Sequence, residues 1–83
     1  MEEVVGKVTH FFPKIGVAVV KLDKGTLNLG NKVKISGKLG HFDQEIASMQ
    51  IEHQQIEKAS TGDEFGLKVD QPVKVGDQVI KIS

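Results

Sequence analysis

Residues 25–32 read GTLNLGNK, in which two glycines precede an asparagine and a lysine. A phosphate-binding loop of the GxxxxGK[ST] type needs a lysine directly after the second glycine, followed by a hydroxyl residue that holds magnesium. Asn31 and Lys32 occupy those two positions instead. The following residues, NKVKIS, alternate as a strand rather than opening a helix that could face phosphates. The guanine-reading NKxD motif also fails because Lys34 replaces its aspartate, so we predict a tight bend.

The remaining polar residues do not assemble into a catalytic or metal-binding set. His41 and Asp43 lie on one face of a predicted strand, but a metal site needs three or four converging ligands. Asp63 and Glu64 are neighbours, so they point to opposite faces of a strand and cannot act on one substrate. No serine stands in a Gly-x-Ser-x-Gly elbow. We therefore predict no enzyme activity, no catalytic residue, no metal and no cofactor.

Two short stretches combine aromatic and basic residues and are candidates for a binding surface. In HFFPK (10–14), adjacent phenylalanines of a strand point to opposite faces, so one of them is expected to lie exposed beside a histidine and a lysine. That combination can stack bases or anchor a peptide. GHFDQ (40–44) repeats the theme, and the alternative is that the phenylalanines plug the ends of a barrel. The candidates are His10, Phe11, Lys14, His41 and Phe42.

Five further lysines flank one predicted hairpin and could form a phosphate-facing stripe. They are Lys21, Lys24, Lys32, Lys34 and Lys38. Each would supply a point charge without reading a base sequence. The alternative is a solvated outer face that keeps the protein soluble and protects strand edges. The chain has no arginine, which disfavours sequence-specific recognition of nucleic acid.

Bulk composition describes one ordinary globular domain spanning residues 1–83. The net charge is zero, but residues 1–38 hold seven lysines against three acids, and residues 39–83 hold four lysines against eight. This asymmetry predicts a basic and an acidic face unless strand pairing interleaves the halves. The chain has no cysteine, its longest apolar stretch, IGVAVV, is too short for a bilayer, and two glutamates follow Met1. We expect a cytoplasmic protein.

Short alternating segments separated by nine glycines predict an all-β sandwich or barrel. In VVGKVTHF, Val4 and Val8 are expected on one face, whereas IGVAVVKL is apolar on both faces, as in a fully covered strand. LGNKVKIS and VGDQVIKIS share a glycine followed by Asn or Asp and then a strand pattern. Because this is turn chemistry, we predict two equivalent turns that each lead into a strand.

The segment 43–59, DQEIASMQIEHQQIEKA, permits two interpretations. Ile46, Met49, His53 and Ile56 recur at helical spacing, and the composition favours a helix. In the alternative, Ala47, Met49 and Ile51 form one face of a strand, and residues 53–58 form a connection. Periodicity alone leaves both open.

The order of glycines and apolar residues along the chain resembles the second domain of translational GTPases such as elongation factor Tu. The framework covers about residues 4–82 and reads Gly6-x-Val8, Gly16-Val17-Ala18-Val19, Gly25-x-Leu27-x2-Gly30-x2-Val33-x-Ile35, Ile46-x-Ser48-Met49-x-Ile51, Ala59-x2-Gly62-x3-Gly66 and Val75-Gly76-Asp77-x-Val79. The small C-terminal barrel of collagenase-like peptidases has similar glycine spacing.

The resemblance implies a small closed or nearly closed antiparallel β-barrel of six or seven strands, with strand rather than helix at 46–52. It also implies that GTP hydrolysis is absent, because that activity resides in another domain. The function expected from it is a non-catalytic, translation-factor-like binding module that meets RNA or the ribosome. The alternative is a protein–protein interaction domain that completes a larger enzyme, as in the peptidases.

Overall fold

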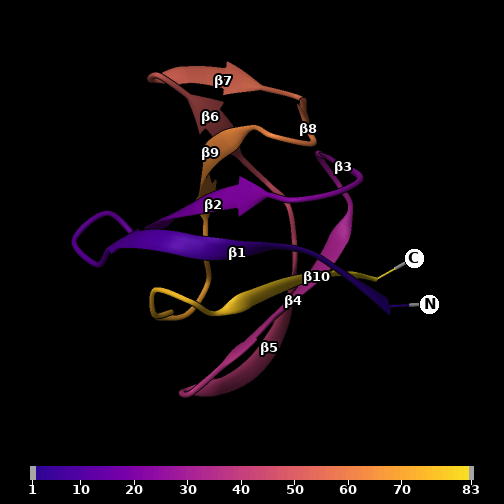
Figure 1. The fold of residues 1–83 in the computed structure, drawn as a ribbon. Coiled ribbons are helices and arrows are strands. Elements are labelled where there is room, and N and C mark those ends of the chain that lie inside the picture. The colour runs from indigo at the N-terminus through magenta and orange to yellow at the C-terminus, as the bar shows by residue number, and fades with distance from the viewer. Residues whose placement is uncertain (1, 83) are drawn as a thin grey trace.

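The computed structural model describes residues 2–82, which form ten β-strands (Figure 1). The strands are β1 (Glu2–Phe12), β2 (Val17–Leu22), β3 (Thr26–Asn28), β4 (Lys32–Gly37), β5 (Gly40–Glu45), β6 (Met49–Ile51), β7 (Gln54–Ile56), β8 (Lys58–Ser60), β9 (Glu64–Lys68) and β10 (Gln78–Ile82). Every strand pair is antiparallel. Within residues 2–82, no helix has the length and apolar character that a membrane crossing requires.

Eight strands form one sheet in the order β5-β4-β10-β1-β2-β9-β6-β7, and β3 pairs with β8 in a second, two-stranded sheet. The sheet curls around its apolar face, but within residues 2–82 no strand pairing joins its two ends, β5 and β7 (Figure 1). The predicted all-β, antiparallel character is therefore confirmed. The predicted closure into a barrel is not confirmed, and the chain has ten short strands instead of six or seven.

A single side chain ties β5 to the segment that follows β9. Gln44 is buried, its amide nitrogen donates to the carbonyl of Lys68 at 2.8 Å, and its amide oxygen accepts from the backbone amide of Asp70 at 2.8 Å. The side-chain amide thus donates and accepts as a backbone peptide group would in a strand ladder. Because β5 has no second strand partner within residues 2–82, this pair of bonds holds the first strand of the sheet across the open side.

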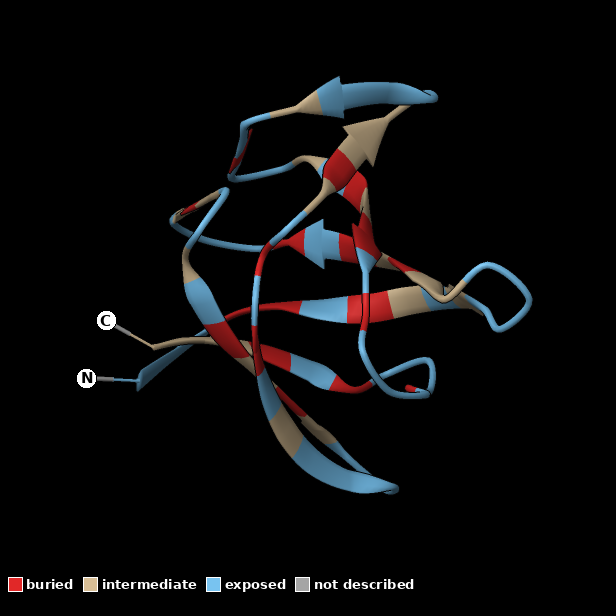
Figure 2. Cartoon of the chain, turned by 180° about the vertical axis from the view of Figure 1, so that it is seen from behind, coloured by how far each residue is buried: buried red, intermediate tan, exposed pale blue. Residues whose placement is uncertain are grey.

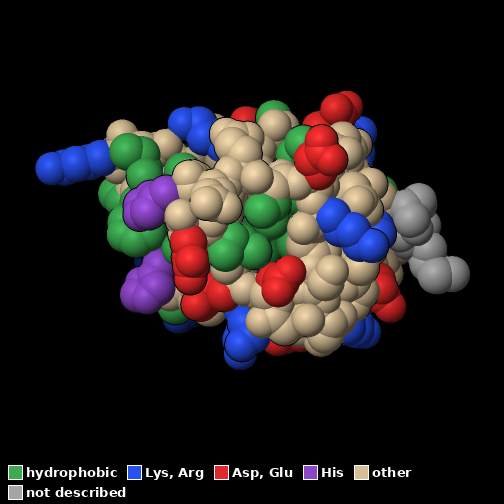
Figure 3. All heavy atoms as spheres, turned by 90° about the horizontal axis from the view of Figure 1, so that it is seen from above, with side chains coloured by type: hydrophobic (Ala, Val, Ile, Leu, Met, Phe, Trp, Pro, Cys, Tyr) green, Lys and Arg blue, Asp and Glu red, His purple; other side chains and the backbone are tan. Residues whose placement is uncertain are grey.

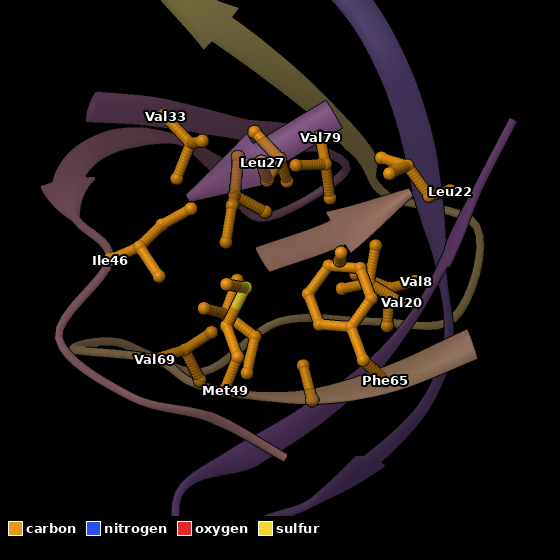
Figure 4. Packing of buried hydrophobic residues seen from close by; sticks show 14 of the residues in the cluster. Val8, Val20, Leu22, Leu27, Val33, Ile46, Met49, Phe65, Val69 and Val79 are labelled. Atoms are coloured by element: carbon orange, nitrogen blue, oxygen red, sulfur yellow. The ribbon is translucent and has the colours of Figure 1, made fainter. Parts of the chain in front are cut away.

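The core consists of sixteen buried apolar side chains from both sheets and the connections (Figures 2 and 4). In Figure 4, Met49 and Phe65 point toward Leu27 and Val79, so β3, β6, β9 and β10 meet at the centre. Phe65 and Met49 are among the largest fully buried side chains, and each contributes about 1.5–3 kcal/mol by leaving water.

A bulge in β1 and the one-sided burial of β2 determine which valines face the core. The pairing of β1 with β10 shifts between Val4 and Gly6, so that Val5 is an extra residue. This bulge turns Val5 inward beside Val8 and leaves Val4 41% exposed, so the predicted Val4–Val8 face is wrong. In β2 the residues alternate between buried and partly or fully exposed, so the prediction of a strand covered on both faces is also wrong.

Residues 43–59 form strands and turns, so the helical interpretation is wrong. The predicted strand is confirmed at Met49–Ile51 but not over the whole of 46–52, and Ala47, expected on the same face as Met49, is exposed. Strands β6 and β7 make a hairpin in which Ile51 pairs with Gln54. Its two-residue turn consists of Glu52 at φ 51° and His53 at φ 67°. Positive φ at both central residues is typical of a type I′ turn, which matches the natural twist of the flanking strands. The connection over 53–58 is thus mostly the strand β7 rather than a helix.

Three turns of the same sequence form lead into β4, β9 and β10. They read NLGN (28–31), STGD (60–63) and KVGD (74–77), and the glycine of each has a positive φ, as in type II turns. In each turn the final Asn or Asp accepts a hydrogen bond from the backbone amide three residues earlier, at 2.9 Å. The prediction that LGNKVKIS and VGDQVIKIS begin with equivalent turns is confirmed. GTLNLGNK is therefore a bend into a strand.

Candidate functional site

Three connections lie side by side at one end of the molecule, which we call the loop end. It comprises residues 12–16 between β1 and β2, residues 37–40 between β4 and β5, and residues 69–77 between β9 and β10. In Figure 1 the first and third of these lie at the left, and the β4–β5 turn lies below them at the lower left. Val69 donates its backbone amide to Gly16, which joins the first loop to the third. Reciprocal backbone bonds join Val8 to Gly76 and Asp77.

Large apolar side chains are concentrated at the loop end. Among residues 2–82, the exposed large hydrophobic residues are Val4, Phe12, Ile15, Leu29, Leu39 and Val75. Four of these six belong to the loop end, and they include the three most exposed, Val75 at 67% and Ile15 and Leu39 at 58%. Figure 3 shows hydrophobic side chains gathered with histidines and a lysine at the corresponding end of the molecular surface. Grouped exposed apolar residues of this kind are typical of contact surfaces.

Two shallow hollows separate the three loops. The first, of about 200 Å³, lies between the 12–16 and 69–77 loops and is lined by Phe11, Pro13, Gly16, Val69, Asp70, Gln71 and Pro72. The second, of about 240 Å³, lies between the 37–40 and 69–77 loops and is lined by Gly37, Lys38, Lys74, Val75, Gly76 and Asp77. Small-molecule sites usually enclose roughly 300–1,000 Å³. Each hollow is therefore better matched to one inserted side chain than to a whole ligand.

The rim of the loop end is basic. Residues 12–16, 37–40 and 69–77 contain three lysines and two aspartates. Asp77 is buried, and its carboxylate accepts the backbone amide of Lys74 at 2.9 Å. The ion pairs found within residues 2–82 join Lys24 to Glu3 and Lys34 to Glu2, so none involves a lysine of the loop end. The uncompensated charge exposed here is consequently positive.

The structure brings six of the ten predicted binding residues to the loop end or its borders. They are His10, Phe11, Lys14, Lys38, His41 and Phe42. His10 stacks on Phe12 with ring centroids 6.3 Å apart and planes at 21°. Phe11 and Phe42 are only partly exposed and pack against the core, which is the behaviour expected of phenylalanines that cover the end of the fold. Phe12 is the exposed member of the pair, at 49%.

The other four predicted lysines do not join this surface and do not form an uncompensated stripe. Lys21 lies opposite Glu64 across β2 and β9, and Lys32 lies opposite Glu45 across β4 and β5. Lys34 pairs with the carboxylate of Glu2 at 3.0 Å, and the Nζ of Lys24 lies 3.8 Å from a carboxylate oxygen of Glu3. Strand pairing has therefore interleaved the basic and acidic halves of the sequence. This arrangement fits the solvated outer face that was the alternative interpretation.

Sequence reasoning missed Ile15, Leu39 and Val75. Ile15 was placed in a covered strand because it begins the run IGVAVV, but it lies in a turn whose amides at Ile15 and Gly16 both donate to the carbonyl of Phe12. The signal was available, because Pro13 and Gly16 bracket a turn. Val75 likewise occupies the second position of the KVGD turn, where a side chain projects to solvent.

The polar residues considered for catalysis serve the turns and strands. The Asp63 carboxylate accepts the amide of Ser60, and the Glu64 carboxylate accepts the hydroxyl of Thr9 at 3.0 Å. The hydroxyl of Thr61 donates to the carbonyl of Gly25. Within residues 2–82, no three His, Asp or Glu side chains gather closely enough to hold a metal ion.

Comparison with known proteins relates this chain to proteases. It is 36% identical over 76 residues to an uncharacterized protease of Methanocaldococcus jannaschii, and 30% identical over 78 residues to a collagenase of Porphyromonas gingivalis. These matches cover 90% and 93% of this chain but only 18% and 22% of the relatives, so the chain spans about a fifth of their length. No family model matches the chain.

Solved structures reproduce the fold over its whole length. Two crystal structures contain the C-terminal domain of a Geobacillus thermoleovorans protein described as a U32 peptidase, one of them as the selenomethionine variant. They match with TM-scores of 0.87 and 0.89 at 22% and 23% identity, covering 96% and 98% of this chain and 99% and 93% of the solved chains. This likeness shows that the chain has the fold of that domain.

These findings correct the predicted assignment. The similar sequences are named as a protease and collagenases, and the similar structures are peptidase C-terminal domains rather than translation-factor domains. The expectation of a translation-factor-like module that meets RNA or the ribosome is therefore wrong. The alternative interpretation, a domain like the one in collagenase-like peptidases, agrees better with the comparisons.

Proposed function

We propose that this chain is a non-catalytic accessory domain of the kind found at the C-terminal end of U32 peptidases. In this role it contacts the body of a peptidase and supports hydrolysis that occurs elsewhere. The observation that carries the proposal is the match over nearly the full length of both the chain and the solved peptidase domain. The similarity to segments of a protease and a collagenase supports the same role.

The arrangement of polar groups supports a non-catalytic role. The carboxylates of Asp63 and Asp77 each accept a backbone amide within a turn, and the hydroxyl of Thr61 donates to a backbone carbonyl. Among the described residues, the Thr9 hydroxyl donates to the Glu64 carboxylate at 3.0 Å, but no hydrogen bond from a third group orients this carboxylate as a catalytic base requires. The two hollows are also too small to enclose a peptide segment.

The test uses the Porphyromonas gingivalis collagenase in three versions: intact, lacking its segment that matches this chain, and with that segment replaced by residues 1–83. We expect removal of the segment to lower collagen hydrolysis and the replacement to restore it. The 83-residue chain alone should release no peptide from collagen. Hydrolysis by the isolated chain, or a replacement no better than the deletion, would contradict the proposal. Full activity of the collagenase without its segment would also contradict it.

A further inference from the structure

We propose that the loop end is the docking surface of the domain and that it fits an acidic protein surface with an apolar centre, the one carried by the peptidase body. This inference rests on the proposed function and adds to it the face used and the chemistry of the partner. It follows from three features of the loop end: its apolar tips, its paired hollows and its unpaired lysines.

The apolar tips argue for a partner. Phe12, Ile15, Leu39 and Val75 come from three separate loops. A backbone bond joins the 12–16 loop to the 69–77 loop, and the 37–40 loop lines one hollow together with the 69–77 loop. None of these side chains serves the core, because each is about half exposed or more. Covering them would remove apolar surface from water without disturbing the fold.

The hollows identify the partner as a protein surface. They flank the 69–77 loop on its two sides, and each has room for about one large side chain. Side chains that project from a folded protein surface could enter the two hollows on either side of the 69–77 loop. A small molecule would be poorly enclosed, because each hollow lies below the usual volume of a ligand pocket.

Charge selects an acidic partner and disfavours a second copy of this chain. Lys14, Lys38 and Lys74 rim the apolar tips without an ion pair inside residues 2–82. In a twofold dimer through this face, the positive surface of one copy would meet the same positive surface of the other, and the lysines would repel one another. Acidic groups around an apolar centre would instead pair with the lysines as the tips are covered.

The first test measures binding of the 83-residue chain to the collagenase that lacks its matching segment, by isothermal titration calorimetry. Substituting Phe12→Ser, Ile15→Ser and Val75→Ser together should weaken binding at least ~10-fold. The matched control, Val4→Ser with Leu29→Ser, removes exposed apolar side chains away from the loop end and should change affinity less than ~2-fold. Circular dichroism verifies that every variant is folded.

The second test reverses charge at the rim with Lys14→Glu, Lys38→Glu and Lys74→Glu. This variant should also bind at least ~10-fold more weakly. Added salt should weaken the binding of the original chain but should no longer weaken the binding of the variant. Its control reverses three exposed lysines elsewhere and should bind within ~2-fold of the original chain. The control substitutions are Lys7→Glu, Lys24→Glu and Lys58→Glu.

The outcomes separate this inference from the proposed function. If the replaced collagenase is active but the loop-end variants bind as well as their controls, the docking surface is wrong and the accessory role stands. Absence of binding by the original chain also overturns the inference. So would binding to phosphatidylserine vesicles without binding to the shortened collagenase, or a dimer in sedimentation equilibrium that the loop-end substitutions dissolve. If the replacement fails to restore hydrolysis, the proposed function itself is wrong.

Discussion

Replacing Gln44 with glutamate should make the stability of the domain depend on pH in a way that the original chain does not. The side-chain amide of Gln44 donates to the carbonyl of Lys68 and accepts from the amide of Asp70, both at 2.8 Å. A protonated glutamic acid can make the same two bonds. An ionised carboxylate cannot donate, and it would turn a lone pair toward the carbonyl of Lys68.

The reference for this effect is Gln44→Met, which keeps the side-chain size but removes both hydrogen bonds. Lys68 and Asp70 are exposed residues, so water can partly satisfy the freed backbone groups. We therefore take the lower part of the usual range, about 1 kcal/mol per bond. Gln44→Met should lower the free energy of unfolding by about 2 kcal/mol, which corresponds to roughly 8–16 °C in Tm for a domain of this size. This loss should not vary between about pH 4 and pH 7, because methionine does not titrate.

Burial and the lost bond should raise the pKa of the carboxyl introduced by Gln44→Glu above its usual ~4.3 in the folded state. The unfolded chain then loses its proton first as the pH rises, so stability falls between the unfolded and the folded pKa and is constant above both. A carboxylate penalty of about 2 kcal/mol corresponds to about 1.5 pKa units. Gln44→Glu should thus approach the original stability near about pH 4 and lie about 2 kcal/mol below it above about pH 6.

The assay is urea unfolding followed by circular dichroism at a series of pH values, with the original chain and Gln44→Met measured in parallel. The difference between Gln44→Glu and the original chain should grow as the pH rises. A difference that stays constant with pH, or a Gln44→Met variant as stable as the original, would refute the view that this amide holds β5 across the open side of the sheet.

Three further predictions concern the backbone. Replacing Glu52→Asn together with His53→Gly should raise the free energy of unfolding by about 1–2 kcal/mol, because both residues have positive φ in a type I′ turn. The measurement is urea unfolding, and a lower midpoint concentration of urea for the variant would exclude this explanation. Gly6→Ala should reduce Tm by at least about 10 °C, because its Cβ would clash with the backbone carbonyl oxygen of Lys21. An unchanged melting curve would contradict this close approach. Asp77→Ala should lower the free energy of unfolding by about 1–2 kcal/mol in the same titrations, because the Asp77 carboxylate accepts the amide of Lys74. Asp77→Asn keeps the acceptor oxygen and should lower it by less than half as much. Equal decreases for the two variants would show that this hydrogen bond is unimportant.

Regular strands and turns were largely predictable from the sequence. Val33 and Ile35 of β4 are buried, as the alternation in NKVKIS indicated. The repeated glycine followed by Asn or Asp marked two of the three equivalent turns, and STGD at 60–63 could have been recognised by the same signal. These features depend on residues close in sequence, which is why local patterns contain them.

The irregular features depend on contacts between distant residues and were not predictable. The bulge that turns Val5 inward exists only in the pairing of β1 with β10, and the bonds of Gln44 span 24 and 26 residues. Nothing in the local pattern of β5 distinguishes Gln44 from an ordinary exposed glutamine. The assignment to translation factors failed for a related reason, because glycine spacing reports the fold and not the chemistry on its surface.

Two of the three stretches at the loop end had been singled out from the sequence. The HFFPK and GHFDQ stretches were recognised by their aromatic and basic residues, and both border the loop end. The third loop, residues 69–77, was not recognised, because it lines both hollows only by lying between the 12–16 and 37–40 loops in the folded chain. The lysine stripe could not be judged from one strand, since the acids that lie opposite Lys21 and Lys32 come from other strands.

Hydrogen exchange offers the most direct measurement of the central claim, that this domain docks onto a peptidase body through its loop end. The exchange of backbone amides would be compared between the isolated 83-residue chain and the collagenase in which it replaces the matching segment. We predict slower exchange in the replaced collagenase at residues 12–16, 37–40 and 69–77, and unchanged exchange at residues 23–31. Unchanged exchange at all three loops, or protection confined to residues 23–31, would contradict the account.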